Sequence, residues 1–380
     1  MTIDPAAALA QAMIGRPGSR YRVPTPALVL DEAVLDANIA AMAERVRGRA
    51  ALRPHAKTHK SAWIARKQIA HGAVGVCCAK LGEVEALSAA GVRGVLLTSP
   101  LADTTAPARL CEVARADPDL LCVVDHPDPA TALAAEAARR DLRISVLIDV
   151  DVGLMRTGVA SPDQAVALAE HIARYPSLTL AGVQGYGGHW QHIAGYPARR
   201  EAVRAGMLRL TAVVTALRAA GHRVELVTGG GTGTVGADLE LGVLTELQPG
   251  SYVFMDVQYG DALADDADGA FGTSLWVSSQ VVSANAAPIV TVDAGLKAFA
   301  TEGPTPRPAS GRFAGSAYAF FGDEHGAVSR PPGTEVRLGE RIELVTPHCD
   351  PTVDRYDSYH VVSGDTVTAI IAIDAARASR

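Results

Sequence analysis

The chain has 380 residues, of which 48% are hydrophobic and 20% charged, and this composition is typical of a globular protein with one large and one smaller domain. Its formal net charge of -6 reflects 35 Lys and Arg against 41 Asp and Glu, without a basic run, which argues against a nucleic-acid-binding protein. No apolar stretch reaches the ~18 residues of a membrane-spanning helix, and the N-terminus lacks the pattern of a secretory leader.

The N-terminal region contains a short predicted strand at residues 24–30. Asp31 follows it as a helix N-cap, and the helix is predicted over residues 32–47. We expect residues 1–30 to form an arm whose strand joins a β domain elsewhere in the chain.

Residues 31–264 alternate short apolar runs with Ala-rich helical stretches. This alternation predicts a parallel sheet with helices on both faces, and eight strands match a closed (β/α)8 TIM barrel. A doubly wound open sheet is the alternative architecture. The predicted strands are 51–57, 75–80, 94–99, 121–125, 144–151, 180–186, 223–228 and 245–249, and the helices are 62–71, 83–90, 105–116, 129–140, 161–175 and 197–220.

After residue 264 the helical periodicity fades, and β-rich segments are separated by Gly, Pro and Asp turns. Residues 265–380 are therefore predicted to form a mostly β domain. Its predicted strands are 275–283, 288–292, 335–338, 341–345 and 366–373.

The first predicted barrel strand ends in a basic segment, Arg53-Pro54-His55-Ala56-Lys57-Thr58-His59-Lys60. Active sites of such barrels lie at the carboxyl ends of the strands. A lysine at that position, among other cations, is expected to have a lowered pKa and to act as an amine nucleophile. Such an amine forms a Schiff base with pyridoxal phosphate or with a carbonyl substrate. A solvated basic loop is the alternative.

The seventh predicted strand ends in a glycine-rich loop, Val227-Thr228-Gly229-Gly230-Gly231-Thr232-Gly233-Thr234. Glycines allow backbone N–H groups to converge on an anion, and the threonines add hydroxyl donors. The spacing fits neither a P-loop nor a Rossmann fingerprint, and a plain turn is the alternative. An amine on strand one facing a phosphate cradle on strand seven suggests pyridoxal phosphate.

The basic segment resembles the PHxKTHK signature of the D-threonine aldolase and D-serine dehydratase group, which are pyridoxal-phosphate enzymes with an alanine-racemase type of barrel plus a β domain. The resemblance implies that Lys57 binds the cofactor covalently and that Thr228, Gly230, Gly231, Thr232 and Gly233 lie around its phosphate. It continues through Leu81-Gly82-Glu83, Asp151-Val152-Gly153-Leu154-Met155-Arg156-Thr157-Gly158, Gln191-His192, Gly250-Ser251-Tyr252-Val253-Phe254-Met255-Asp256, Asp323-Glu324-His325-Gly326 and Pro347-His348-Cys349-Asp350-Pro351-Thr352.

The same resemblance implies further cofactor contacts. Arg156 is expected to touch the cofactor oxygen or ring, and Tyr186 to line the pocket. His55 and Tyr259 complete the predicted cofactor site.

Two histidines are candidates for the catalytic base, His59 near the lysine and His192 after strand six, although each is also consistent with a surface position. Trp190 is bulkier than the resemblance leads us to expect. It is predicted to narrow the pocket or to change the preferred aldehyde.

His348 and Asp350 form a candidate metal pair. In an extended chain, residues two apart point the same way, so both side chains would bind one ion while Cys349 faces inward. A turn with ordinary polar residues is the alternative. The dehydratase branch has cysteine at the second position, which suits zinc, whereas an imidazole with a carboxylate favours Mn²⁺ or Mg²⁺ over Zn²⁺.

The resemblance and this metal pair together imply a D-threonine aldolase type of reaction, in which a D-3-hydroxy amino acid gives glycine and an aldehyde. The alternatives are a D-serine or 3-hydroxyaspartate dehydratase and a D-3-hydroxyaspartate aldolase of the same family. A non-catalytic pyridoxal-phosphate carrier is disfavoured because such carriers lack the β domain and the metal pair.

The resemblance also implies a homodimer with shared active sites, to which the Asp323-Glu324-His325 loop of a partner subunit would contribute. The five cysteines are scattered and form no CxxC pair. This pattern disfavours a disulfide framework or a zinc knuckle and favours a reducing cytoplasm.

Overall fold

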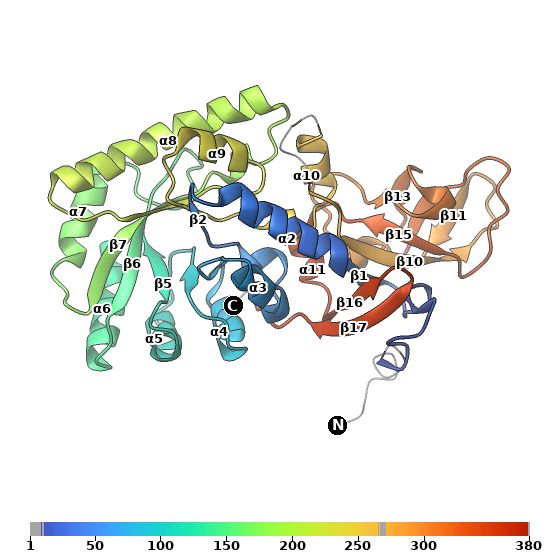
Figure 1. The fold of residues 1–380 in the computed structure, drawn as a ribbon, viewed down its shortest axis with the longest axis horizontal. Helices are drawn as coiled ribbons and strands as arrows, with labels where there is room; N and C mark the ends of the chain where they lie inside the picture. The colour runs from blue at the N-terminus through green and yellow to red at the C-terminus, as the bar shows by residue number, and fades with distance from the viewer. Residues whose placement is uncertain (1–8, 10, 265, 267–270, 379–380) are drawn as a thin grey trace.

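The computed structural model describes residue 9, residues 11–264, residue 266 and residues 271–378. Part of the predicted N-terminal arm and residue 265, at the predicted domain boundary, lie outside the described residues. The described chain forms an eight-stranded parallel sheet and a nine-stranded, mostly antiparallel sheet, which lie side by side (Figure 1).

The eight-stranded sheet curls into the predicted barrel. Its strand order is β2-β9-β8-β7-β6-β5-β4-β3, and a single parallel bridge between His55 and Cys77 joins the two ends. Each of the eight predicted strands overlaps one of these strands, which confirms the barrel rather than the doubly wound sheet. The strands are β2 (Ala51–Leu52), β3 (Val76–Cys78), β4 (Val95–Leu97), β5 (Leu121–Val124), β6 (Ile144–Asp149), β7 (Leu178–Gly185), β8 (Leu226–Gly229) and β9 (Glu246–Leu247).

Helices surround this sheet and bury their apolar faces against it. The helix predicted after Asp31 begins as expected, because the Asp31 carboxylate accepts a hydrogen bond from Val34 N at 3.2 Å. The two short helices α9 and α10 are absent from the prediction because neither is long enough to show periodicity. The helices are α2 (Glu32–Val46), α3 (Ala62–Ala70), α4 (Leu81–Ala89), α5 (Ala106–Ala116), α6 (Pro127–Arg139), α7 (Pro162–Ile172), α8 (Tyr196–Ala219), α9 (Val235–Leu241) and α10 (Val257–Ala262).

The nine-stranded sheet lies mostly in the C-terminal third of the chain. The predicted N-terminal strand, β1 (Ala27–Asp31), lies within it, antiparallel to β10 and parallel to β16. The other strands are β10 (Leu275–Ser283), β11 (Ile289–Val292), β12 (Arg307–Pro308), β13 (Tyr318–Phe320), β14 (Gly326–Ser329), β15 (Arg341–Val345), β16 (Ser358–Ser363) and β17 (Thr366–Ala372), with the short helix α11 (Cys349–Val353) after β15.

One predicted strand of this domain is wrong. Residues 335–338 form no strand, and Leu338 within them is 70% exposed, so its apolar side chain has no core to join. The prediction also omits β12, β13, β14 and β16, which are short or rich in small and polar residues.

The two sheets share an apolar core. Phe254, which follows the last barrel strand, packs against Tyr359 of β16 with ring centroids 5.7 Å apart, and both side chains are fully buried. No helix among the described residues is long and apolar enough to cross a membrane.

Candidate active site

The candidate catalytic lysine lies in a tight turn at the seam of the barrel. β2 ends at Leu52, and Lys57 belongs to a 3-10 turn, Ala56–Thr58, rather than to the predicted strand 51–57. The cause is local: His55 Nδ1 accepts a hydrogen bond from Lys57 N at 3.4 Å, which bends the chain out of the sheet. The turn directs Lys57 towards the C-terminal domain.

Lys57 Nζ forms an ion pair with Asp350 Oδ2 from α11. Burial lowers the pKa of Lys57, but the attraction of Asp350 outweighs it, so the pKa is raised. The predicted lowering of the Lys57 pKa is therefore wrong for this state of the protein. The nearest charge is a carboxylate rather than the neighbouring basic residues. Burial raises the pKa of Asp350, whereas Lys57 and His348 lower it further, and the net pKa is lowered.

His55 lies next to the lysine turn and is nearly buried. Its Nε2 is 3.1 Å from Thr98 Oγ1, whose hydroxyl donates to Cys78 O, so the imidazole N–H donates to the threonine oxygen. Burial, followed by the charge of Lys57, lowers the pKa of His55 to about 3. The ring is therefore neutral at physiological pH.

His59 is completely buried and does not reach the barrel mouth as predicted. Its Nδ1 accepts a hydrogen bond from Ser61 N at 3.1 Å, and its Nε2 donates to Gln68 Oε1 at 3.2 Å. Burial lowers its pKa to about 4. Both ring nitrogens are thus engaged in holding the loop together.

His192 lies beside the candidate metal pair. Its ring centroid is 4.5 Å from that of Tyr259 and 6.5 Å from that of His348. Burial, followed by the proximity of His348, lowers the pKa of His192 to about 4. A neutral imidazole at this position can accept a proton.

His348 and Asp350 do not lie in an extended chain, as the sequence prediction assumed, because His348 caps the short helix α11. The two side chains nevertheless face each other, with His348 Nε2 4.0 Å from Asp350 Oδ2, and Cys349 is buried. The helical turn thus replaces strand alternation as the cause of their convergence.

The pair has the donor set of a divalent-cation site. His348 Nδ1 lies 3.2 Å from Glu302 Oε1, a partner that leaves the Nε2 lone pair for a metal. Asp350 Oδ1 is buried without a well-formed hydrogen bond, although Thr58 lies near the carboxylate and contributes to its low pKa. The described residues contain no cluster of three His, Cys, Asp or Glu side chains, so water and substrate would complete the coordination.

The glycine loop after β8 is held tightly by neighbouring side chains. Gly231 N donates to Thr234 Oγ1 at 3.1 Å and Gly233 N donates to Gln191 Oε1 at 3.0 Å, while Thr232 Oγ1 accepts from Tyr252 N at 3.0 Å. These contacts give the loop a fixed shape at the carboxyl end of β8, and they occupy Gly231 N and Gly233 N, two of the N–H groups predicted to face an anion.

Gln191 supports this loop and was not predicted as a site residue. A Cβ at Gly231 would lie 2.5 Å from Gln191 Oε1, and one at Gly233 would lie 2.1 Å from Gln191 O. Only glycine permits this approach. The sequence signal that could have revealed Gln191 is its position directly before His192. The residue that supports the glycine loop is thus the neighbour of the candidate base.

Gly230 has a φ of +71°, and Asp238 Oδ2 occupies the space of its missing Cβ at 2.4 Å. Thr228 lies before the loop and is fully buried. Its hydroxyl donates to Glu246 Oε1 at 2.9 Å inside the barrel, so the structure does not bring this hydroxyl into the loop.

Arg156 and Tyr186 lie together, with the guanidinium carbon 5.4 Å from the Tyr186 ring centroid. Trp190 is buried, and its ring fills the space above Gly187 and Gly206, the latter in α8. The predicted narrowing of the pocket by Trp190 is therefore wrong, because the ring packs into the core.

The predicted partner loop, residues 323–325, lies in the turn between β13 and β14. Glu324 forms an ion pair with Lys297 there, within the nine-stranded sheet. The strand register places this turn at the end of the hairpin opposite the 284–288 turn, where Leu296 N donates to Gly322 O at 3.1 Å and Lys297 N donates to Asp323 O at 3.0 Å.

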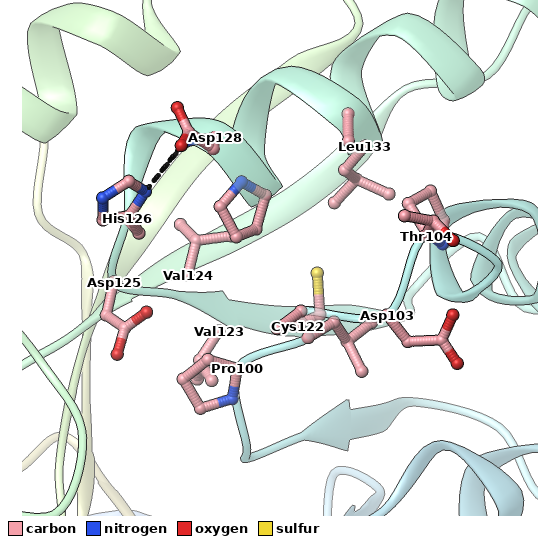
Figure 2. A pocket seen from close by; sticks show the side chains of 15 residues that line it. Pro100, Asp103, Thr104, Cys122, Val123, Val124, Asp125, His126, Asp128 and Leu133 are labelled. Atoms are coloured by element: carbon pink, nitrogen blue, oxygen red, sulfur yellow. Dashed lines mark hydrogen bonds and ion pairs between the residues drawn. The ribbon is translucent and has the colours of Figure 1, made fainter.

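A separate cavity of about 490 Å³ lies at the barrel rim beside β5 and α6. Figure 2 shows its mainly apolar wall around Val124 and Leu133, with His126 and Asp128 at one edge. None of the predicted cofactor or metal residues lines it, so this cavity is distinct from the candidate site.

Comparisons with known proteins agree with this arrangement. The alanine racemase N-terminal domain model matches residues 30–258, and the putative serine dehydratase domain model matches residues 274–362. The chain is 39% identical over 364 residues to a D-threonine aldolase from Arthrobacter sp., covering 94% of each chain. It is 32% identical over 359 residues to a 3-hydroxy-D-aspartate aldolase from Paracoccus denitrificans (strain Pd 1222), covering 93% of this chain and 92% of the relative.

A solved structure is also similar. The crystal structure of D-threonine aldolase from Filomicrobium marinum superposes with a TM-score of 0.90 at 33% sequence identity, covering 94% of this chain and 97% of that one. The similarity therefore extends over the barrel and the β domain together.

Proposed function

This chain belongs to the family of the alanine racemase N-terminal domain, and we propose that it is a lyase of the D-threonine aldolase type that depends on pyridoxal phosphate and a divalent metal. It cleaves a D-3-hydroxy amino acid into glycine and an aldehyde. The observation that carries this proposal is the convergence of Lys57 on the His348 and Asp350 pair. The domain boundary is proposed at residues 264–265, between the two family matches.

The residues present fit the cofactor. Lys57 offers a primary amine for its carbonyl group, and we place the loop containing Gly230, Gly231, Thr232 and Gly233 around its phosphate, with Gly231 N and Gly233 N holding the loop in shape through bonds within the protein. His55, Arg156, Tyr186 and Tyr259 are proposed as the surrounding cofactor residues, whereas Thr228 donates to Glu246 inside the barrel and is not proposed as a direct contact. Bound pyridoxal phosphate supplies the electron sink for cleavage of the Cα–Cβ bond.

The metal pair, His348 and Asp350, would hold an ion on the side of the site where the substrate hydroxyl group lies. His348 Nε2 and the Asp350 carboxylate are the atoms that would hold the ion, which acts there as a Lewis acid on the hydroxyl oxygen. A carboxylate in place of a second soft ligand favours Mn²⁺ or Mg²⁺ over Zn²⁺.

We assign the base role to His192 rather than His59. The ring centroid of His192 lies 6.5 Å from that of His348, solvent reaches part of the residue, and its pKa is lowered, so a ring nitrogen can accept the proton of the substrate hydroxyl. Both nitrogens of His59 are engaged in hydrogen bonds below the lysine turn.

Two reactions of related enzymes are alternatives within the same site. A 3-hydroxyaspartate aldolase would release glyoxylate from its substrate, and a D-serine or 3-hydroxyaspartate dehydratase would release ammonia. A 3-hydroxy-D-aspartate aldolase is among the relatives, and this supports the 3-hydroxyaspartate aldolase reaction as the second candidate function.

A substrate panel separates these reactions. The purified protein, loaded with pyridoxal phosphate and Mn²⁺, is incubated with D-threonine, D-allo-threonine, D-phenylserine, D-3-hydroxyaspartate and D-serine. Glycine and acetaldehyde from D-threonine are expected. Ammonia and a 2-oxo acid without glycine would overturn the proposal in favour of the dehydratase. Treatment with EDTA is expected to abolish glycine release and addition of Mn²⁺ to restore it.

The lysine assignment has a spectroscopic test. Lys57→Ala is expected to lose the visible absorbance of the imine between lysine and cofactor. Unchanged absorbance would remove Lys57 from this role, whatever the activity of the variant.

We also propose a cytoplasmic homodimer. All five cysteines are free and buried, which supports a reducing compartment. Phe321, in the hairpin before Asp323-Glu324-His325, is 62% exposed, which supports contact of this hairpin with a second subunit. Light scattering on the purified protein, with and without Phe321→Ser, tests the oligomeric state.

A further inference from the structure

Two ion pairs connect the lysine loop, residues 55–62, to the helix that begins at the metal pair. Lys57 pairs with Asp350, and Lys60 Nζ lies 2.9 Å from Asp354 Oδ1. The two lysines are three residues apart and the two aspartates four, so each spacing corresponds to about one helical turn. The loop and α11 therefore face each other over one turn, with an ion pair at each end.

Lys60 is also anchored within the barrel. Its Nζ lies 2.8 Å from Glu83 Oε1, while Glu83 Oε2 accepts hydrogen bonds from Ala79 N and Lys80 N at the start of α4. Lys60 and Glu83 are both buried, and Lys60 has a φ of +51°, an uncommon conformation for a residue with a side chain. The ammonium thus joins a fixed point of the barrel to α11.

The backbone around Lys60 is held from the same side. Tyr359 donates its hydroxyl to His59 O at 2.6 Å, and Ala375 N donates to Lys60 O at 3.0 Å. These contacts fix the loop against β16 and the C-terminal segment. They leave Lys60 as the side chain that reaches from this loop to the far end of α11.

The first turn of α11 has its own support. Asp256 Oδ2 accepts a hydrogen bond from Cys349 N at 2.9 Å, and Thr352 Oγ1 donates to His348 O at 2.7 Å. Asp256 therefore holds the start of the helix and Lys60 holds its end at Asp354. His348 and Asp350 lie at the start of this doubly held helix.

We propose that Lys60 is a positioning residue that fixes α11, and with it His348 and Asp350, opposite Lys57. The cation site of the reaction then forms at a set distance from the lysine that carries the cofactor. This inference rests on the metal site of the proposed function.

The test measures Mn²⁺ affinity by calorimetry on the cofactor-loaded protein, together with the absorbance of the lysine–cofactor imine. Asp354→Asn removes the charge that pairs with Lys60 but keeps a side-chain oxygen that can accept from Arg377 N, and Lys60→Met removes the whole bridge. Both are expected to weaken Mn²⁺ binding roughly tenfold, as for a lost supporting contact of a metal ligand, with the imine absorbance retained. The double variant is expected to lose no more than Lys60→Met alone, because both changes break one interaction.

Lys67→Met is the matched control. Lys67 Nζ also bridges two carboxylates, Glu32 at 2.9 Å and Asp36 at 2.8 Å, but it joins α3 to α2 on the barrel exterior. Its Mn²⁺ affinity is expected to equal that of the unaltered protein.

Three outcomes contradict the role of Lys60. They are unchanged Mn²⁺ affinity in Asp354→Asn, an equal loss in Lys67→Met, or parallel loss of metal affinity and imine absorbance. If Lys60→Met fails to fold, Asp354→Asn decides, because Lys60 keeps its Glu83 partner in that variant. Absence of Mn²⁺ binding in the unaltered protein would instead refute the metal site of the proposed function.

Discussion

The two loops that form the candidate cofactor site are held in different ways. The lysine loop is tied by charged side chains of the C-terminal domain, Asp350, Asp354 and Asp374. The glycine loop, residues 229–234, is held inside the barrel by close backbone packing and by uncharged partners such as Gln191. Ion pairs can exchange when another cation arrives, whereas a packed backbone cannot. We therefore expect substitutions at the glycine loop to cause large losses of stability or cofactor binding, and substitutions at the lysine loop to cause smaller ones.

The largest effect is expected at Trp190, the buried residue that precedes Gln191. Trp190→Ala removes a buried indole next to Gln191 and leaves a cavity against Gly206. We expect a loss of about 4 kcal/mol in the free energy of unfolding, measured by chemical denaturation. Trp63→Ala is a suitable comparison, because Trp63 is only partly buried on α3 and its loss should be smaller. Equal losses would contradict the expectation that the deeper burial of Trp190 sets the size of its effect.

A second substitution tests the close approach itself. Gly233→Ala places a Cβ 2.1 Å from Gln191 O, where the backbone must move. We expect a loss of about 3 kcal/mol in stability together with weaker binding of pyridoxal phosphate, measured by absorbance titration. Gly260→Ala is the control, because no atom lies within 4 Å of its added Cβ. Normal cofactor affinity in Gly233→Ala would show that the loop adapts after all.

A buried acid behind the glycine loop should make its stability pH-dependent. Burial raises the pKa of Asp238 to about 7, although the Thr234 hydroxyl bond opposes this. The folded protein thus keeps a proton that the unfolded chain releases near pH 4. This stabilisation is present in full below about pH 4 and is lost as the pH rises through about 7.

Asp238→Asn should therefore gain stability relative to the unaltered protein as the pH rises. Denaturation at pH 5 and pH 8 is expected to show a change in the difference of roughly 2 kcal/mol. A constant difference across this pH range would mean that Asp238 does not titrate in the folded state.

The smallest effect is expected at the lysine loop. Asp374 Oδ2 accepts a hydrogen bond from Ala62 N at 2.7 Å and so caps α3 from the C-terminal segment. Asp374→Ala should cost about 1 kcal/mol of stability and leave the fold intact. Ser61→Ala is the internal control, because the Ser61 hydroxyl has no hydrogen-bond partner among the described residues. A larger loss of stability in Asp374→Ala than in Gly233→Ala would contradict the expectation that the glycine loop is the more sensitive of the two.

The barrel could be predicted because each strand is a continuous apolar run between helical segments. Lys57 and the His348 and Asp350 pair could be predicted from the motifs that contain them. The charge state of Lys57 could not, because its partner is 293 residues away in the sequence. The same limit applies to Lys60 with Asp354, since neither spacing nor composition reveals which acid a lysine reaches after folding.

The position of Lys57 at the seam of the barrel has a consequence for when the site forms during protein synthesis. β2 pairs with β9, and its bridge to β3 at His55 lies two residues before Lys57. Asp350, the partner of Lys57, lies 293 residues later in the chain. During synthesis, the reactive amine therefore meets its acidic partner only after the segment that contains Asp350 has also emerged from the ribosome. A nascent chain interrupted before that point would display the amine without the surroundings that restrict its chemistry.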